Sequence, residues 1–278
     1  GSTPQTHHEE WKRAHSEAMA SVRAAPRLYL PLAFASGFGA AMIFRRALGW
    51  LSSGGKLRLH LYDHCPYCVR VEIVLGRFKI PYERVVYGYG DKKGPMALTG
   101  KKVLPVLEGP SVPTGKGMKG MPESLDIIAH LTSTYNLSLP CDTGRRDVKQ
   151  WREKFDKIRR PLQRPRLIQM PVKDWATPED KKYARQKYSK DDPEYYEKAL
   201  EATPELLAEA SQLLKDLQEL MHGENSLNAW GFGMDDIKIL PDLRNMTCVQ
   251  GIEWPEKIWE YVSKNCEAAG VTLYEGVP

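Results

Sequence analysis

Two cysteines separated by two residues are the side chains best suited to chemistry in this chain. Cys65 and Cys68 lie in HLYDHCPYC, residues 60–68. Such a pair can exchange with disulfides, contribute half of a metal site or form a structural disulfide. A zinc site needs two more ligands, and no second C-x-x-C occurs. His60 and His64 lie too close to the same strand end to complete a tetrahedron easily, so the pattern favours redox exchange.

The residues around the cysteines predict a strand, a helix and a second strand. Residues 56–62, KLRLHLY, alternate as a strand does, and the segment 69–78 has apolar residues at helical spacing. Residues 83–88, ERVVYG, are a second strand candidate. A C-x-x-C at the first turn of a βαβ unit is typical of a thioredoxin-like fold.

This arrangement places Cys65 at the start of a helix. Unpaired N–H groups and the helix dipole stabilise a thiolate there and lower its pKa. Pro66 suits the first helical position because no hydrogen bond is lost. We therefore predict that Cys65 is the attacking nucleophile and that Cys68, one turn further on, resolves the mixed disulfide.

Two later stretches have the features of a binding site. VLPVLE, residues 103–108, places Pro105 at the entry of an apolar strand, although a proline at a strand start also occurs without any function. MPESLDIIAHL, residues 121–131, predicts a strand end, a turn and a helix, with Glu123 and Ser124 at the helix N-terminus. N–H groups at such an end bind a carboxylate well, and simple capping by Ser124 is the alternative.

These three motifs together resemble the large two-domain glutaredoxins of the bacterial glutaredoxin 2 type. The segments TPEDKKYARQKY and 235–261 are similar to that family too, so the resemblance covers about residues 57–275. It implies an α/β thioredoxin-like domain at 56–135, a linker at 136–144 and an all-α domain at 145–278 shaped like that of glutathione transferases. It also implies glutathione as co-substrate. We expect no metal, because the cysteine pair lacks two further ligands.

Residue by residue, the resemblance assigns a glutathione site beside the cysteines. Tyr67 flanks the site, and Pro105 is expected in the cis form opposite the cysteine pair. The backbone of Leu104 would bond to the cysteinyl part of glutathione. Glu123 and Ser124 would hold its γ-glutamyl end.

The N-terminal segment 1–55 departs from that family. Residues 28–44 contain no charged residue; Arg27 lies just before them, and Arg45 and Arg46 follow. A helix of this length spans about 25 Å against about 30 Å for a bilayer core. We predict a single transmembrane helix at about 28–46, with a small-residue stripe for helix packing formed by Ala33, Gly37 and Ala41. A buried core helix or a remnant of a targeting signal is the alternative.

Composition bounds the compartment and the partners. Five cysteines, an odd and sparse set, do not resemble a secreted disulfide framework, and a net charge of +5 is too small to indicate nucleic acid. We expect a reducing compartment and, given the span, an organelle membrane, either the plastid thylakoid or the mitochondrial inner membrane.

Two segments predict surface features of the folded body. The basic helix at 145–166 has an apolar stripe and should turn its basic residues outward, either to solvent or to an anionic partner. The segment 109–120, GPSVPTGKGMKG, should form a long hairpin loop close to the site.

The best-supported function is a membrane-tethered glutathione-dependent thiol–disulfide oxidoreductase. Its partners would be glutathione, protein disulfides or glutathionylated proteins, and helices of other membrane proteins. The alternative is an accessory or structural subunit of an organelle membrane complex that retains the fold. A glutathione transferase acting on electrophiles fits less well, because two cysteines favour redox cycling over conjugation.

Overall fold

The computed structural model describes residues 56–189 and 192–278. The predicted membrane span at 28–46, with Ala33, Gly37 and Ala41, lies outside the described residues. Within the described part, every helix is too short or too polar to cross a membrane.

The first domain contains a four-stranded sheet. Its strands are β1 (Leu57–Leu61), β2 (Tyr82–Val86), β3 (Val106–Glu108) and β4 (Met121–Pro122). Their order is β2-β1-β3-β4; β1 and β2 run parallel, whereas β3 is antiparallel to both β1 and β4. The strands predicted from 56–62 and 83–88 are confirmed, and β3 begins directly after Pro105 as expected.

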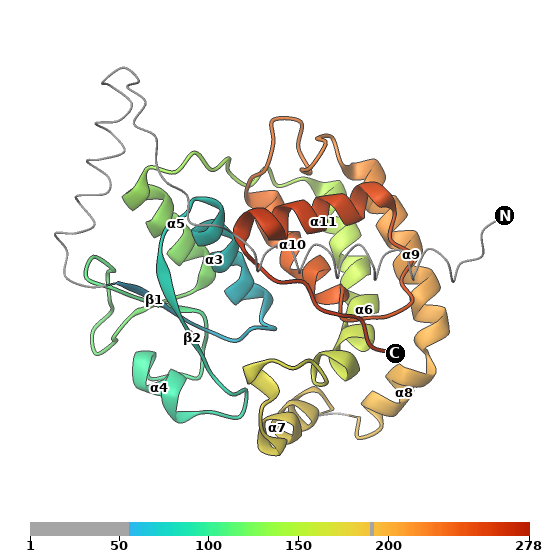
Figure 1. Cartoon of the computed structure of the whole chain (residues 1–278), viewed down its shortest axis with the longest axis horizontal. Coiled ribbons are helices and arrows are strands. Elements are labelled where there is room, and N and C mark those ends of the chain that lie inside the picture. The colour runs from blue at the N-terminus through green and yellow to red at the C-terminus, as the bar shows by residue number, and fades with distance from the viewer. Residues whose placement is uncertain (1–55, 190–191) are drawn as a thin grey trace, which may run out of the picture. The chain divides into compact units, whose positions relative to one another are not determined.

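Three helices belong to this domain: α3 (Pro66–Arg77), α4 (Lys93–Thr99) and α5 (Ser124–Tyr135). Figure 1 shows two of the strands, β1 and β2, beside α3. Helix α3 contacts α5 and also two helices of the second domain, so residues on several of its sides are buried. A helix with apolar residues on several sides is stable when most of its surface is buried, as that of α3 is. The helix that carries the cysteines is therefore held by both domains.

The second domain is entirely helical. It contains α6 (Arg146–Leu167), a short 3₁₀ turn η1 (Lys173–Trp175), α7 (Pro178–Tyr188), α8 (Tyr195–Glu201), α9 (Thr203–Leu220), α10 (Met234–Met246) and α11 (Glu256–Ala269). Helix α10 is buried along almost its whole length and contacts α3, α6 and α11. Figure 1 shows α6, α9, α10 and α11 on the side of α3 away from β1 and β2.

The prediction that the basic residues of α6 all face outward was wrong. Arg152 and Arg159 approach the carboxylate of Asp242 on α10, at 2.9 and 3.2 Å, and Asp242 is only 2 % exposed. Arg166 is 1 % exposed and donates to the carbonyl oxygen of Leu162. A buried carboxylate is costly unless positive groups face it, which explains why arginines of this helix turn inward.

The loop 109–120 does join two antiparallel strands, but it lies away from the cysteines. Glu108, where β3 ends, pairs with Arg58 near the start of β1, and Gly109 approaches Leu57. Cys65 follows the opposite end of β1. Because β3 is antiparallel to β1, the loop after β3 lies at the other end of the sheet, and the expectation of a loop close to the site was wrong.

A close helix contact predicts one large effect on stability. A Cβ atom at Gly76 of α3 would lie 1.8 Å from the carbonyl oxygen of Ala269 at the end of α11. Gly76→Ala is therefore expected to lower the free energy of unfolding by about 1–3 kcal/mol, measured by urea denaturation. Ala208→Gly on the exposed side of α9 calibrates helix propensity, at about 1 kcal/mol. A gain of that size for Gly76→Ala would contradict the close contact.

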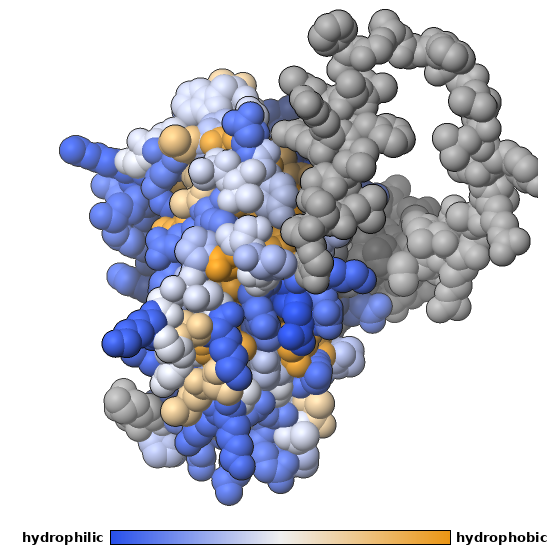
Figure 2. Space-filling model, turned by 90° about the vertical axis from the view of Figure 1, so that its left-hand side faces the viewer, coloured by the Kyte–Doolittle hydropathy of each residue, from blue (hydrophilic) through white to orange (hydrophobic). Residues whose placement is uncertain are grey.

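The face drawn in Figure 2 is mainly hydrophilic, with hydrophobic residues scattered among the polar ones. Among the described residues, the large exposed hydrophobic side chains come from different elements: Tyr67, Met96, Leu125, Leu200 and Trp230. Single exposed apolar side chains are ordinary on a protein surface. Tyr67 differs from the others because it flanks the cysteine pair.

Candidate active site

Cys65 sits at the junction of β1 and α3, as the N-cap residue of the helix. Its N–H donates to the carbonyl oxygen of Tyr62 at 3.2 Å, and its own carbonyl accepts from Val69 at 3.0 Å. Pro66 occupies the first helical position, as predicted. Cys65 is partly exposed and Cys68, one turn along, is fully buried. Cys65, and not Cys68, is therefore the cysteine that a substrate can reach.

The surroundings of the two thiols separate their pKa values. A hydrogen bond from the Cys68 thiol, with help from His64 and the N–H groups of Cys68 and Tyr67, lowers the pKa of Cys65 to about 7 despite its burial. Burial, and then the neighbouring Cys65 sulfur, raises the pKa of Cys68 well above its usual value. Near neutral pH a substantial fraction of Cys65 is therefore thiolate, whereas Cys68 remains a thiol.

A cavity of about 430 Å³ opens beside Cys65. Six residues expected at the site line it: Cys65, Tyr67, Leu104, Pro105, Glu123 and Ser124. The Leu104–Pro105 peptide bond is cis, as expected. Segments far apart in the chain therefore meet at one cavity, while Cys68 is buried and does not line it.

The N-terminus of α5 forms one wall of this cavity. Glu123 is the N-cap residue, with φ of 69°, and its side chain makes no capping hydrogen bond. Ser124 is the first helical residue and is buried, so the alternative that Ser124 caps the helix was wrong. The N–H groups of a first helical turn have no partner within the helix and are suited to an anion. The positive φ of Glu123 is unfavourable for a residue other than glycine, and such backbone strain is often found at binding sites.

The sequence did not indicate the residue that holds His64. Asp174, in η1 of the helical domain, is completely buried. Its carboxylate accepts from the N–H groups of Asp63 and His64 at 3.0 and 2.8 Å, and its Oδ2 lies 2.5 Å from Nδ1 of His64. In the sequence, His64 stands out only as a possible metal ligand. No pattern connects Asp174 to the cysteine motif 110 residues away.

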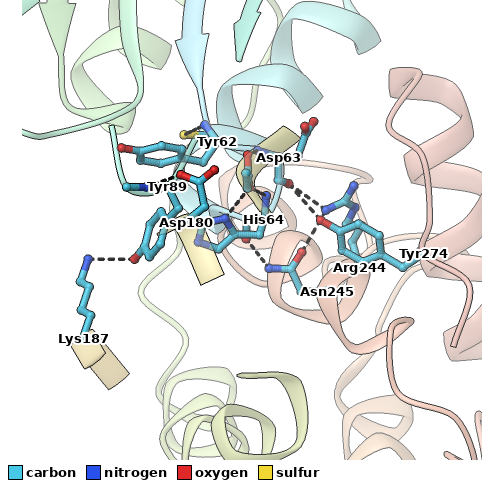
Figure 3. A network of polar contacts seen from close by, with 12 residues as sticks. Tyr62, Asp63, His64, Tyr89, Asp180, Lys187, Arg244, Asn245 and Tyr274 are labelled. Atoms are coloured by element: carbon cyan, nitrogen blue, oxygen red, sulfur yellow. Dashed lines mark hydrogen bonds and ion pairs between the residues drawn. The ribbon is translucent and has the colours of Figure 1, made fainter. Parts of the chain in front are cut away.

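Tyrosines and lysines complete another wall. The hydroxyl of Tyr89 bonds to that of Tyr188 at 2.8 Å. It also accepts from Nζ of Lys187 at 2.8 Å, as Figure 3 shows. Nζ of Lys102 lies 3.6 Å from the ring centre of Tyr183. Burial, and then the positive charge of Lys92, lowers the pKa of Lys102 to about 8.

The position of Tyr89 is set by the helical domain. Its N–H donates to the carbonyl oxygen of Asp174 at 2.9 Å, and the next N–H, of Gly90, donates to Asp180 at 2.7 Å. Asp180 also forms the capping box of α7 with Thr177. The motif TPEDKKYARQKY contains this box as well as Lys187 and Tyr188. This motif was therefore the one sequence feature that could have pointed to Lys187 and Tyr188 as cavity residues. By itself it does not show that they lie beside the cysteines.

Within residues 56–189 and 192–278, no group of three or more histidine, cysteine or acidic side chains is arranged to hold a metal ion. The reactive groups that the site offers are the two thiols, one partly exposed and one buried.

The lowered pKa of Cys65 predicts a pH profile for its alkylation. Only the thiolate reacts, so the rate with iodoacetamide should rise with pH and reach half its maximum near pH 7, instead of near 9. Mass spectrometry of the peptide containing Cys65 separates this reaction from that of Cys141, which is exposed and lies outside the cavity. A midpoint near 9 for Cys65 would contradict the stabilised thiolate.

Comparisons with known proteins agree with this arrangement. A family model for the C-terminal domain of glutaredoxin 2 matches residues 147–277, and a model for the N-terminal domain of glutathione S-transferases matches residues 59–139. Glutaredoxin 2 of Escherichia coli strain K12 is 30 % identical over 219 residues, which cover 78 % of this chain and 97 % of that protein.

Solved structures share the same fold. Glutaredoxin 2 of Salmonella typhimurium, in complex with glutathione, superposes with a TM-score of 0.71 at 26 % identity, over 78 % of this chain and 96 % of that one. A glutathione S-transferase of Rhodospirillum rubrum gives 0.50 at 17 % identity, over 76 % and 87 %, and shares the fold alone. The predicted thioredoxin-like domain followed by a helical domain of the glutathione-transferase type is confirmed. The chain belongs to the glutaredoxin 2 family.

Proposed function

We propose that this protein reduces disulfides with glutathione, with Cys65 as nucleophile and Cys68 as resolving thiol. Membership of the glutaredoxin 2 family makes the chain a glutathione-dependent oxidoreductase. The observation that supports the assignment of Cys65 is its position: a thiol with a pKa lowered to about 7 faces a cavity that also contains the N-terminus of a second helix. A glutathione transferase would not need a second thiol beside Cys65. The buried Cys68 fits redox cycling, because it can form a disulfide with Cys65.

The first step is thiol–disulfide exchange. The Cys65 thiolate attacks the glutathione sulfur of a glutathionylated substrate, a new S–S bond forms, and the old S–S bond breaks. The released substrate thiolate takes a proton from water. A second glutathione, as thiolate, attacks the glutathione sulfur of the mixed disulfide. This attack yields oxidised glutathione and regenerates the Cys65 thiolate.

A dithiol route uses Cys68. After the first exchange Cys68 loses its proton and attacks the sulfur of Cys65, which expels the bound thiolate and forms the Cys65–Cys68 disulfide. The proton lost from Cys68 balances the one that the leaving thiolate gains. Burial, and then the neighbouring Cys65 sulfur, raises the pKa of Cys68, and the second of these influences is relieved when Cys65 enters the mixed disulfide. Two glutathione molecules then reduce the disulfide and leave as oxidised glutathione.

The cavity walls suit a small peptide with two carboxylates. Its volume of about 430 Å³ lies in the usual range for small-molecule sites. One carboxylate of glutathione, on the γ-glutamyl residue, would bind at Glu123 and Ser124, where α5 begins. The other, on glycine, would face the positive charges of Lys102 and Lys187. The backbone of Leu104, next to the nucleophile, would bond to the cysteinyl residue between them.

The reaction partners and the cellular location extend this proposal. Protein disulfides and glutathionylated proteins are the proposed substrates. The uncharged segment 28–44 supports a tether to an organelle membrane, thylakoid or mitochondrial inner, beside other membrane-protein helices. Alkaline carbonate extraction of native membranes tests the tether, and release of the protein into the supernatant would exclude it.

A coupled assay tests the activity. The full-length chain is mixed with the disulfide between glutathione and 2-mercaptoethanol, and with glutathione, glutathione reductase and NADPH. We expect NADPH oxidation that saturates with the mixed disulfide and that disappears when Cys65 is alkylated beforehand. Absence of turnover by the untreated, folded protein would overturn the proposal.

A further inference from the structure

The two residues before the nucleophile are held by the helical domain. The carbonyl oxygen of Asp63 accepts from a guanidinium N–H of Arg244 at 2.9 Å. The carbonyl oxygen of His64 accepts from Nδ2 of Asn245 at 2.6 Å. Figure 3 shows these side chains, with Tyr274, gathered beside Asp63 and His64. The backbone that leads into Cys65 is thus fixed by groups that lie about 180 residues later in the chain.

Asp174 contacts the same two residues, Asp63 and His64. Unlike Arg244 and Asn245, which bind only their backbone carbonyl oxygens, it has a carboxylate and also contacts a side chain. It accepts from two backbone N–H groups, as a purely structural acceptor would, and it also bonds to the His64 imidazole. Its side chain is completely buried and His64 is 7 % exposed. Burying a charged group costs desolvation free energy, and a buried ion pair often adds little net stability to the fold. Stability alone is therefore a poor reason for a buried carboxylate at this place.

The imidazole is fixed on its remaining sides by aromatic rings. Its centre lies 4.5 Å from the ring of Trp175 and 4.7 Å from that of Tyr89, which meets it edge-on. Tyr62 lies 5.9 Å away. The ring therefore has a defined orientation, and Nδ1 is taken by Asp174. In the described part of the chain, no residue hydrogen-bonds to Nε2.

We propose that Asp174 is a positioning residue for the nucleophile. By binding Nδ1 of His64 it holds the imidazole beside Cys65, so that the helical domain sets the reactivity of a thiol in the other domain. This inference rests on the proposed function, since it takes Cys65 as the attacking group.

The physical reason is the same as for any carboxylate that supports a histidine. A carboxylate at Nδ1 holds the proton on that nitrogen and fixes the orientation of the ring. A positive charge next to a thiol stabilises the thiolate. His64 is among the main influences that lower the pKa of Cys65, after the hydrogen bond from Cys68, and Asp174 itself is not. Asp174 thus acts on the sulfur through His64.

Other charged groups face the same cavity and must be separated from this effect. Besides Cys65, the titratable groups with a contact to the imidazole are Asp174, which bonds to Nδ1, and the rings of Tyr62 and Tyr89. Around the Cys65 sulfur the cavity wall adds Lys102 and Lys187, and also Glu123, Tyr67 and Tyr188. None of these other groups is changed in Asp174→Asn, so a shift of the midpoint in that variant is caused by the change at Asp174.

The test measures the thiol directly on the full-length chain. The rate of alkylation of Cys65 by iodoacetamide is followed from pH 5 to pH 10, with mass spectrometry of the peptide. For Asp174→Asn we expect the midpoint to move to higher pH and the rate at pH 6 to fall by about threefold to tenfold. Asparagine keeps the shape and one acceptor oxygen. His64→Gln is expected to give the same shift and serves if Asp174→Asn does not fold.

A double-mutant cycle decides whether the effect passes through His64. Asp174→Asn should change nothing further in the His64→Gln protein. Asn245→Ala is the matched control, because it removes a contact from the helical domain to the His64 carbonyl without touching the imidazole. It should lower the melting temperature and leave the midpoint unchanged.

Three results would overturn the inference. They are an unchanged midpoint in folded Asp174→Asn, an equal shift for Asp174→Asn in the His64→Gln background, and an equal shift in Asn245→Ala. Alkylation requires no glutathione. Failure of the coupled assay with a normal alkylation profile would therefore count against the proposed function and not against this role of Asp174.

Discussion

Replacing Cys65 by serine is expected to lower the rate of the coupled glutathione assay by about 1000-fold or more. The serine hydroxyl fits the space but remains protonated at neutral pH, so the nucleophile is lost while the cavity keeps its lining. The measurement is the initial rate of NADPH oxidation at saturating mixed disulfide. Circular dichroism should show an unchanged fold, since Cys65 is partly exposed and a serine hydroxyl can still hydrogen-bond to Cys68.

Two further cysteine variants make this result specific. Cys68→Ser should retain turnover with the small glutathione mixed disulfide, because a second glutathione can resolve the intermediate, and should lose the dithiol route with protein disulfides. Cys141→Ser is the matched control, since Cys141 is exposed and does not line the cavity; its rate should be unchanged. Substantial activity in Cys65→Ser would remove Cys65 from the role of nucleophile.

Replacing Asp236 by alanine should lower the free energy of unfolding by about 3–5 kcal/mol, more than Gly76→Ala. Asp236 on α10 is completely buried. Its carboxylate accepts from the N–H groups of Gly233 and Leu227, each at 2.8 Å, and from the hydroxyl of Tyr261 at 3.0 Å. Alanine would leave all three donors buried without a partner. The free energy of unfolding is obtained from urea titration of the full-length variant.

A control on the protein surface calibrates this loss. Asp216→Ala on α9 removes an exposed carboxylate that accepts from Gln212 and should change stability by less than about 0.5 kcal/mol. Asp236→Asn keeps one acceptor oxygen and should fall between the two. An effect of Asp236→Ala as small as that of Asp216→Ala would show that the three donors find other partners.

The local part of the site was predictable because its causes are local. The alternation of 56–62, Pro66 and the two-residue spacing of the cysteines all act within one strand–turn–helix unit. A helix start stabilises a thiolate wherever it is placed. The motifs at Pro105 and at Glu123 were likewise predictable as strand and helix ends. That they meet at one cavity followed from the resemblance to the glutaredoxins, since periodicity contains no information on which ends meet.

Side-chain partners across domains were not predictable. We predicted that the basic residues of α6 face outward, because the sequence does not show which of them lie beside Asp242. The loop 109–120 was expected near the site, yet the direction of β3 places it at the far end of the sheet. In both cases a property of the packed molecule, burial or strand direction, reverses what the local pattern favours.

The sequence by itself determined the reactive dithiol and its place at a helix start, because both depend on residues within a few turns of one another. The order of the two folded domains followed from the resemblance to the glutaredoxins. Only the tertiary structure decided what surrounds the dithiol. Packing of the helical domain against α3 brings Asp174 to His64 and Lys187 to Tyr89, over 110 and 98 residues of chain. Electrostatic interactions depend on distance in space, and that distance is set by folding.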